Sequence, residues 1–194
     1  PDELPRRVVD SINRDDLPEG TEQIMVDSAG PAAEALMMLR RAGCSTIDVI
    51  SSTAGTPSIV ARETGFLRAA AEAGLEVRVS RAGPTGYATG SEAARQVFAS
   101  SRRPDGVFCV TDLLALGFMD VARREFGRRI PEDLCVIGFD DIPQAAWTSY
   151  ELTTFRQPLD AMVERIVALL ASDAVSDGPY RLPVRTVWRR SVRP

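Results

Sequence analysis

The sequence predicts an α/β protein whose strands form a parallel sheet. Segments with the apolar spacing of helices alternate with strand-like segments, and the connections between them are short. Two of the strand-like segments, 106–110 and 133–139, are nearly continuous apolar runs, as expected for strands that are covered on both faces. Strand, helix and strand at this spacing are typical of βαβ units, and 194 residues with 44% hydrophobic content are enough for one or two domains.

Each element follows from its own residues. Segments with strand-like composition, beginning with the β-branched run STIDVIS, are 45–51, 75–80, 106–110 and 133–139. Segments with helical spacing of apolar residues are 58–74, 91–100, 112–127 and 159–172. Gly74 suits the C-terminal cap of the first of these helices, and Ser91 suits the N-cap of the second. The tail 181–192 is predicted to be extended, whereas the first 30 residues mix helix-like, strand-like and turn residues.

The residue types exclude much of common enzyme chemistry. The sequence contains no histidine, which removes histidine general bases, imidazole zinc ligands and a Ser-His-Asp triad. The three cysteines (Cys44, Cys109 and Cys135) are far apart in the sequence, so no Cys-x-x-Cys metal or redox motif exists. We therefore expect no enzyme, no cofactor and no metal site. Buried cysteines of this kind fit a reducing, cytoplasmic setting.

The charge pattern argues against nucleic-acid or membrane binding by this chain alone. The net charge is −4, and arginine doublets recur mostly at predicted helix ends, where cations favour the negative end of the helix dipole. No run approaches the roughly 18 apolar residues of a membrane helix. The first residues also lack the apolar stretch of a signal peptide.

Polar residues follow four predicted strands at the point where each strand ends. They lie in the loops 52–62 and 81–90, at Thr111 and Asp112, and at Asp140 and Asp141. Because ligands of open parallel sheets bind beyond the carboxyl ends of the strands, we expect these side chains to line one binding edge.

Each of these residues also has a purely structural interpretation. Thr111 or Asp112 could cap the helix that begins there, and Asp141 could close a turn before Ile-Pro. Arg62 could be a surface ion-pair residue that contributes little. The stretch AGTPS (54–58) lacks both glycine-rich nucleotide-binding patterns, so nucleotide binding of those types is not expected.

Ordered motifs along the chain resemble the effector-binding domain of the LacI/GalR family of bacterial transcriptional regulators. The matching stretches are VDSAG (26–30), ARETGF (61–66), PDGVFCVTDLLALG (104–117), IPEDLCVIGFDD (130–141) and LTTFRQP (152–158). The resemblance implies two Rossmann-like parallel-sheet subdomains of periplasmic-binding-protein type, between which the chain crosses near residues 27, 155 and 185. One subdomain would hold 28–154 plus 185–194. The other would hold 1–27 plus 155–184 and would be incomplete, short by several strands.

The resemblance also implies the roles of individual residues. Arg62 would donate to an effector, Asp140 would accept from it, and Thr56 and Ser58 match loop positions that contact ligand in some members. Thr111 stands where many sugar-responsive members carry Asn, and Thr85 where many carry a stacking aromatic ring that Tyr87 could supply instead. Gln157 would lie at a crossover facing the ligand. Asp112 and Asp141 would be structural acceptors beside the site.

The function that the resemblance implies is that of a ligand-responsive regulator, most often a repressor. The effector would be a sugar, a sugar phosphate or a nucleobase, and the protein would be a homodimer with Trp147 and Tyr150 as candidate interface anchors. Trp147 could instead pack on its own core. The helix-turn-helix that binds operator DNA is absent from these residues, and we expect that segments are missing, through truncation or through omission within the first 30 residues. A periplasmic sugar-binding protein of an ABC transporter is the alternative, and an enzyme using Asp112, Asp140 and Asp141 as acids is a third class.

Overall fold

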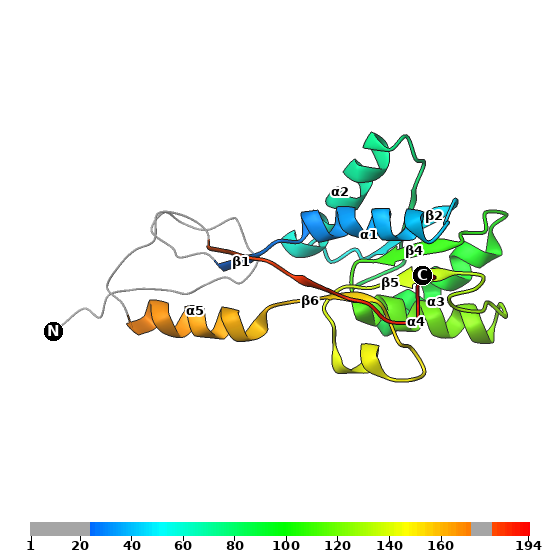
Figure 1. Ribbon diagram of the computed structural model, residues 1–194. Coiled ribbons are helices and arrows are strands. Elements are labelled where there is room, and N and C mark those ends of the chain that lie inside the picture. Colours follow the sequence, from blue (N-terminus) through cyan, green and yellow to red (C-terminus); the bar gives the residue numbers. More distant parts are fainter. Residues whose placement is uncertain (1–23, 172–179) are drawn as a thin grey trace. The chain divides into compact units, whose positions relative to one another are not determined.

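The computed structural model describes residues 24–171 and 180–194 (Figure 1). The chain divides into two units: one holds Pro1–Asp27 and Gln157–Arg185, and the other holds Ser28–Arg156 and Thr186–Pro194. No helix within the described ranges has both the length and the apolar character that a membrane crossing requires.

The larger unit is built on a four-stranded sheet in the order β3-β2-β4-β5, with every neighbouring pair parallel. Its strands are β2 (Ile47–Ser51), β3 (Arg78–Arg81), β4 (Gly106–Cys109) and β5 (Cys135–Ile137). Every residue of β2, β4 and β5 is buried, as expected when helices cover both faces of a parallel sheet. The predicted α/β fold with a parallel sheet is therefore confirmed.

Two pairs of helices cover the opposite faces of this sheet (Figure 1). They are α1 (Ala29–Arg41) with α2 (Pro57–Glu72), and α3 (Tyr87–Ala99) with α4 (Asp112–Arg124). Phe66 of α2 stacks on Phe108 of β4 with ring centroids 5.0 Å apart. The second pair packs backbone against backbone, because a β-carbon on Gly117 of α4 would lie only 2.0 Å from the carbonyl oxygen of Tyr87.

Two short sheets complete the described structure. In the smaller unit, β1 (Ile24–Val26) pairs in parallel with β7 (Tyr180–Leu182), and Met162 of α5 (Leu159–Ala171) packs on them. The other two-stranded sheet pairs β6 (Thr154–Arg156) with β8 (Arg185–Val187). A short 3-10 helix, η1 (Pro143–Ala146), lies between β5 and β6.

Three details of the predicted elements need correction. The predicted N-cap Ser91 is wrong, because α3 begins at Tyr87 and the Ser91 hydroxyl instead donates to the carbonyl of Tyr87 at 3.2 Å inside the helix. The strand predicted at 75–80 begins later, at Arg78. Helix α1 was not predicted at all, although Ala32, Ala35, Leu36 and Leu39 give it a buried face.

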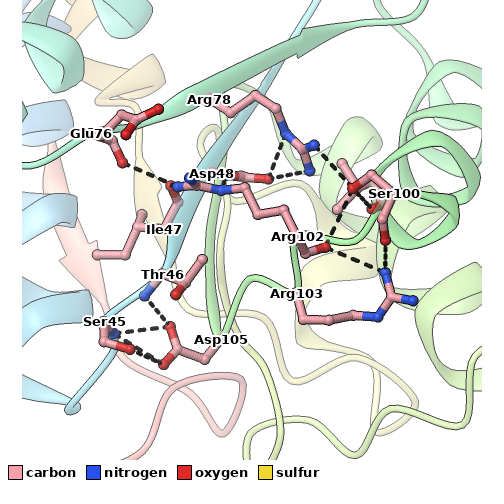
Figure 2. Close-up of polar contacts among 11 residues, drawn as sticks. Ser45, Thr46, Ile47, Asp48, Glu76, Arg78, Ser100, Arg102, Arg103 and Asp105 are labelled. Atoms are coloured by element: carbon pink, nitrogen blue, oxygen red, sulfur yellow. Dashed lines mark hydrogen bonds and ion pairs between the residues drawn. The ribbon is translucent and has the colours of Figure 1, made fainter.

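A buried ion-pair network stabilises the sheet near the amino ends of its strands (Figure 2). Asp48 of β2 is buried, and its two carboxylate oxygens each lie 2.9 Å from a guanidinium nitrogen, one of Arg78 and one of Arg102. Arg102 also donates to the carbonyl oxygens of Ile47 and Glu76, at 3.2 and 3.1 Å. A buried carboxylate needs such compensation, so this network joins β2, β3 and the loop before β4 at the edge opposite the strand ends described next.

Candidate functional site

The carboxyl ends of β2, β4 and β5 form one edge of the sheet in the larger unit. These three strands are adjacent, so the residues that follow them are neighbours in space although they are far apart in the sequence. Ser52 follows β2, Thr111 follows β4, and Gly138 to Asp141 follow β5. This is the edge at which open parallel sheets bind their ligands.

Arg62 of α2 reaches this edge as a buried cation that is only 3% exposed. Its Nη1 donates to the Val110 carbonyl oxygen at 2.8 Å and lies 3.0 Å from the Asp140 carboxylate. The guanidinium also lies 3.7 Å from the centre of the Phe139 ring. Burial lowers the pKa of Arg62, and the Asp140 carboxylate opposes that effect. The guanidinium plane is thus fixed by contacts on several sides, as a preorganised donor requires.

Asp140 presents its carboxylate from an unusual backbone conformation. Its φ is +123°, a region that non-glycine residues rarely adopt. The backbone N–H of Asp140 donates to the carbonyl oxygen of Phe155 at 2.9 Å, which ties the residue to β6. The Asp140 side chain is 23% exposed and its partner Arg62 is 4% exposed, so an acceptor that is partly open to a ligand lies beside a buried donor.

Asp112, the first residue of α4, holds the loop that carries Asp140. It is fully buried, and its carboxylate accepts hydrogen bonds from the Thr154 hydroxyl at 2.6 Å and from the Ile142 N–H at 2.9 Å. Burial raises the pKa of Asp112 to about 7, although both hydrogen bonds act in the opposite direction. A β-carbon on Gly138 would lie 2.2 Å from the Asp112 carboxylate, so this loop passes close to Asp112 only because residue 138 is glycine.

Thr111 and Asp141 each have structural partners. The Thr111 hydroxyl accepts a hydrogen bond from the Leu114 N–H at 3.4 Å and caps α4. The Asp141 carboxylate is 4% exposed and forms ion pairs with Arg156 and Arg189. Thr111 therefore stands at the binding edge with its oxygen engaged in a cap.

The loop residues lie around the same edge. Thr56 is the exposed N-cap residue of α2, and Ser58 is half-buried in the first turn of that helix. The exposed Thr85 shares a 2.8 Å hydrogen bond with the hydroxyl of Ser52. Ser52 is buried directly after β2. It was not among the predicted ligand contacts, although its position after a predicted strand was an available signal.

The remaining predicted residues lie on other elements, and the two tyrosines have partners of their own. The Tyr87 hydroxyl donates to the Asp120 carboxylate of α4 at 2.5 Å, and the Tyr150 hydroxyl donates to the same oxygen at 3.0 Å. Trp147 is 56% exposed after η1. Gln157 belongs to the other unit.

The chemistry of this edge is that of binding rather than of metal coordination. Among the residues that the structure describes, no three His, Cys, Asp or Glu side chains are grouped so that they could hold a metal ion. The carboxylates at the edge are instead compensated by arginines or by hydrogen-bond donors. A fixed guanidinium beside a fixed carboxylate can bind a ligand that offers both acceptors and donors, such as neighbouring hydroxyl groups.

Known proteins similar to this chain include transcriptional regulators. The chain is 36% identical over 137 residues to the HTH-type transcriptional repressor PurR of Yersinia pestis, an alignment that covers 68% of this chain and 40% of the relative. The chain thus spans about two fifths of the length of the curated relatives it matches. A LacI transcriptional regulator from a Rhodococcus species superposes with a TM-score of 0.84 at 26% identity, covering 94% of this chain and 69% of that one.

A second solved structure is a LacI family regulator from Arthrobacter sp. FB24 in complex with lactose. Its TM-score is 0.80 at 26% identity, and the match covers 92% of this chain and 70% of that one. The model of the periplasmic binding protein-like domain matches residues 36–192. The chain therefore belongs to the periplasmic binding protein-like domain family, as an effector-binding domain of the LacI/GalR type.

Proposed function

We propose that this chain is the effector-binding and dimerisation part of a ligand-responsive transcriptional regulator of repressor type. The observation that carries the proposal is the buried Arg62–Asp140 pair, 3.0 Å apart at the carboxyl edge of the sheet. The similarity to repressors and LacI family regulators supports it. None of the relatives reported above is a transporter component or an enzyme, so they favour the regulator over both alternatives.

The proposed effector is a small molecule that offers both hydrogen-bond donors and acceptors: a sugar, a sugar phosphate or a nucleobase. Arg62 would donate to it and Asp140 would accept from it, with Thr56, Ser58, Thr85 and Thr111 as further polar contacts. Hydroxyl-rich ligands suit this set because each hydroxyl both donates and accepts. The lactose complex of the Arthrobacter relative favours the sugar class. Tyr87 and Gln157 complete the proposed ligand set.

The proposed mechanism is a shift in a conformational equilibrium. An effector shifts an equilibrium only by as much as its affinities for the two states differ. The subdomain that binds it here would hold 28–154 plus 185–194, and 1–27 plus 155–184 would belong to the second subdomain. A homodimer built through Trp147 and Tyr150 would present helix-turn-helix segments, supplied by the whole protein, to operator DNA in the cytoplasm.

A thermal-shift screen of the complete protein tests this function. Panels of sugars, sugar phosphates and nucleobases would be measured against the wild type, Arg62→Ala and Asp140→Asn. Arg68→Ala is the matched control, because Arg68 is exposed on the same helix. A ligand at about 100 times its Kd stabilises the protein by about 2.7 kcal/mol.

We expect one class to raise the melting temperature of the wild type and of Arg68→Ala, and to leave both site variants unchanged. Reading the ligand-induced shift, rather than the melting temperature itself, separates lost binding from lost stability. A ligand that stabilises Arg62→Ala and Asp140→Asn as strongly as the wild type would overturn the site. A chain that responds to none of the panels would overturn the proposed effector class.

A further inference from the structure

The Asp141 carboxylate joins two segments that lie far apart in the sequence. One oxygen lies 2.5 Å from Arg156 Nε, and the other lies 2.6 Å from Arg189 Nη2. Arg156 is the last residue of β6, and Arg189 follows β8 by two residues. The Asp141 side chain is only 4% exposed and Arg189 is 16% exposed, so this pair is shielded from water and is stronger than a surface pair. Arg156 is 60% exposed, so its pair with Asp141 is the weaker of the two.

The chain passes from one unit to the other at each of these two strands. The larger unit ends its first segment at Arg156 and resumes at Thr186, and β6 and β8 pair with each other. Arg189 strengthens this pairing, because its side chain also donates to the Leu152 carbonyl oxygen at 2.8 Å and its backbone N–H donates to the Thr153 hydroxyl at 3.0 Å. One carboxylate thus binds both crossover strands to the larger unit.

Asp141 is also the residue next to the proposed effector contact. Asp140 is hydrogen-bonded through its backbone to Phe155 of β6 and ion-paired through its side chain with Arg62. Positive φ angles at both residues, +123° and +55°, make this dipeptide a fixed and unusual turn. A displacement of the Asp140 backbone is therefore passed to Asp141 through the peptide bond that they share.

We propose that Asp141 is a positioning residue that couples the effector contact at Asp140 to the paired crossover strands β6 and β8. The inference rests on the proposed function for its physiological meaning. In this arrangement an effector that displaces Asp140 changes the ion pairs of Asp141. These ion pairs hold β6 and β8, the two strands by which the chain crosses between the units. Coupling of this kind requires that β8 respond more strongly to the state of Asp140 while the Asp141 ion pairs exist than after they are lost.

A double-mutant cycle read by hydrogen exchange tests the coupling without a known effector. Amide exchange in peptides covering β6 and β8 would be measured in the full chain for the wild type, Asp140→Asn, Asp141→Asn and the double variant. Asp133→Asn is the control for Asp141→Asn, because it removes the partner of Arg129 in an exposed ion pair. β8 is the decisive strand, because β6 is in addition bonded directly to Asp140.

We expect Asp140→Asn to change exchange in β8 by about threefold with Asp141 present, and by much less with Asn at position 141, since contacting residues couple by about 0.5–3 kcal/mol. The Asp133→Asn background should preserve the full response. If Asp141 were merely structural, Asp140→Asn would change amide exchange in β8 by the same factor with Asp or with Asn at position 141. That additive outcome would overturn the proposal. Arg189→Gln, which removes the other partner of the Asp141–Arg189 ion pair, serves as the second variant if Asp141→Asn does not fold.

The ligand screen fails or succeeds independently of this cycle. A non-additive cycle with no ligand found would leave the coupling standing and remove the proposed effector class. An additive cycle with a ligand that depends on Arg62 would leave the function standing and remove the coupling.

Discussion

The replacement Asp112→Asn should flatten the dependence of stability on pH in the acid-to-neutral range. Asp112 is fully buried, and burial raises its pKa from 3.8 to about 7 in the folded protein. Each pKa unit corresponds to about 1.4 kcal/mol, so the folded state disfavours the charged carboxylate by about 4 kcal/mol relative to the unfolded chain. The nearby carboxylates of Asp140 and Asp141 act in the same direction as burial.

The sign follows from proton binding. Between pH 3.8 and about 7 the folded protein holds the Asp112 proton and the unfolded chain does not. The contribution of Asp112 to the free energy of unfolding is therefore greatest below pH 3.8 and falls steadily until the pH passes about 7. Asn has no proton to lose, and it can accept from the Ile142 N–H while it donates to the Thr154 hydroxyl, which is able to reverse its role.

Urea unfolding of both proteins from about pH 4.5 to about pH 8.5 measures this effect. The difference in unfolding free energy between Asp112→Asn and wild type should grow with pH in favour of the variant. Asp133→Asn is a useful control, because the Asp133 pKa is lowered by Arg129 and its contribution is lost only in acid. Parallel profiles for Asp112→Asn and the wild type across this range would refute the reasoning, because they would mean that Asp112 is already charged at pH 4.5 in the folded protein.

Three further substitutions test the packing around the site. Gly138→Ala should lower the free energy of unfolding by about 1–3 kcal/mol, because its new methyl group would overlap the buried Asp112 carboxylate. Gly86→Ala is the control: there is open space around the added carbon, so the urea midpoint should change little. Asp48→Asn should lower the free energy of unfolding by about 1–3 kcal/mol, because Arg78 and Arg102 lose charge-assisted hydrogen bonds to a buried carboxylate. An equal loss for the exposed Asp133→Asn in urea unfolding would contradict this. Gly117→Ala should force α3 and α4 apart and lower the melting temperature; an unchanged melting temperature would show that the close helix contact is not maintained.

The binding edge could be predicted from the sequence because parallel strands bring their carboxyl ends together. Strand-like runs followed by polar residues were enough to place Thr111 and Asp140 at the same edge. The ion pair between Arg62 and Asp140 depends on the strand order β2-β4-β5, which no local pattern specifies. For this reason spacing alone gave Arg62 no partner, and only the family resemblance singled it out.

The missed elements have local causes. Helix α1 begins with Ala-Gly-Pro after an irregular stretch, and Gly30 and Pro31 are typical of turns, although proline is also well accommodated in a first helical turn. The cap predicted at Ser91 failed because α3 begins one turn earlier, at Tyr87, and its N-cap position is occupied by a glycine rather than by a side chain that caps. Helix starts without a capping side chain carry little signal in the sequence.

The two adjacent carboxylates after β5 differ because of the backbone between them. Successive residues of an extended chain point to opposite sides, and the positive φ angles at Asp140 and Asp141 turn the chain further at this point. One carboxylate therefore remains 23% exposed beside Arg62, and the other is buried to 4% exposure between two arginines. The two carboxylates could exchange their positions only if this turn were reversed. Asp140→Asn should therefore change ligand affinity more than the crossover strands β6 and β8, and Asp141→Asn should change these strands more than ligand affinity. Equal effects of both substitutions on ligand affinity would show that the pair acts as a single acceptor.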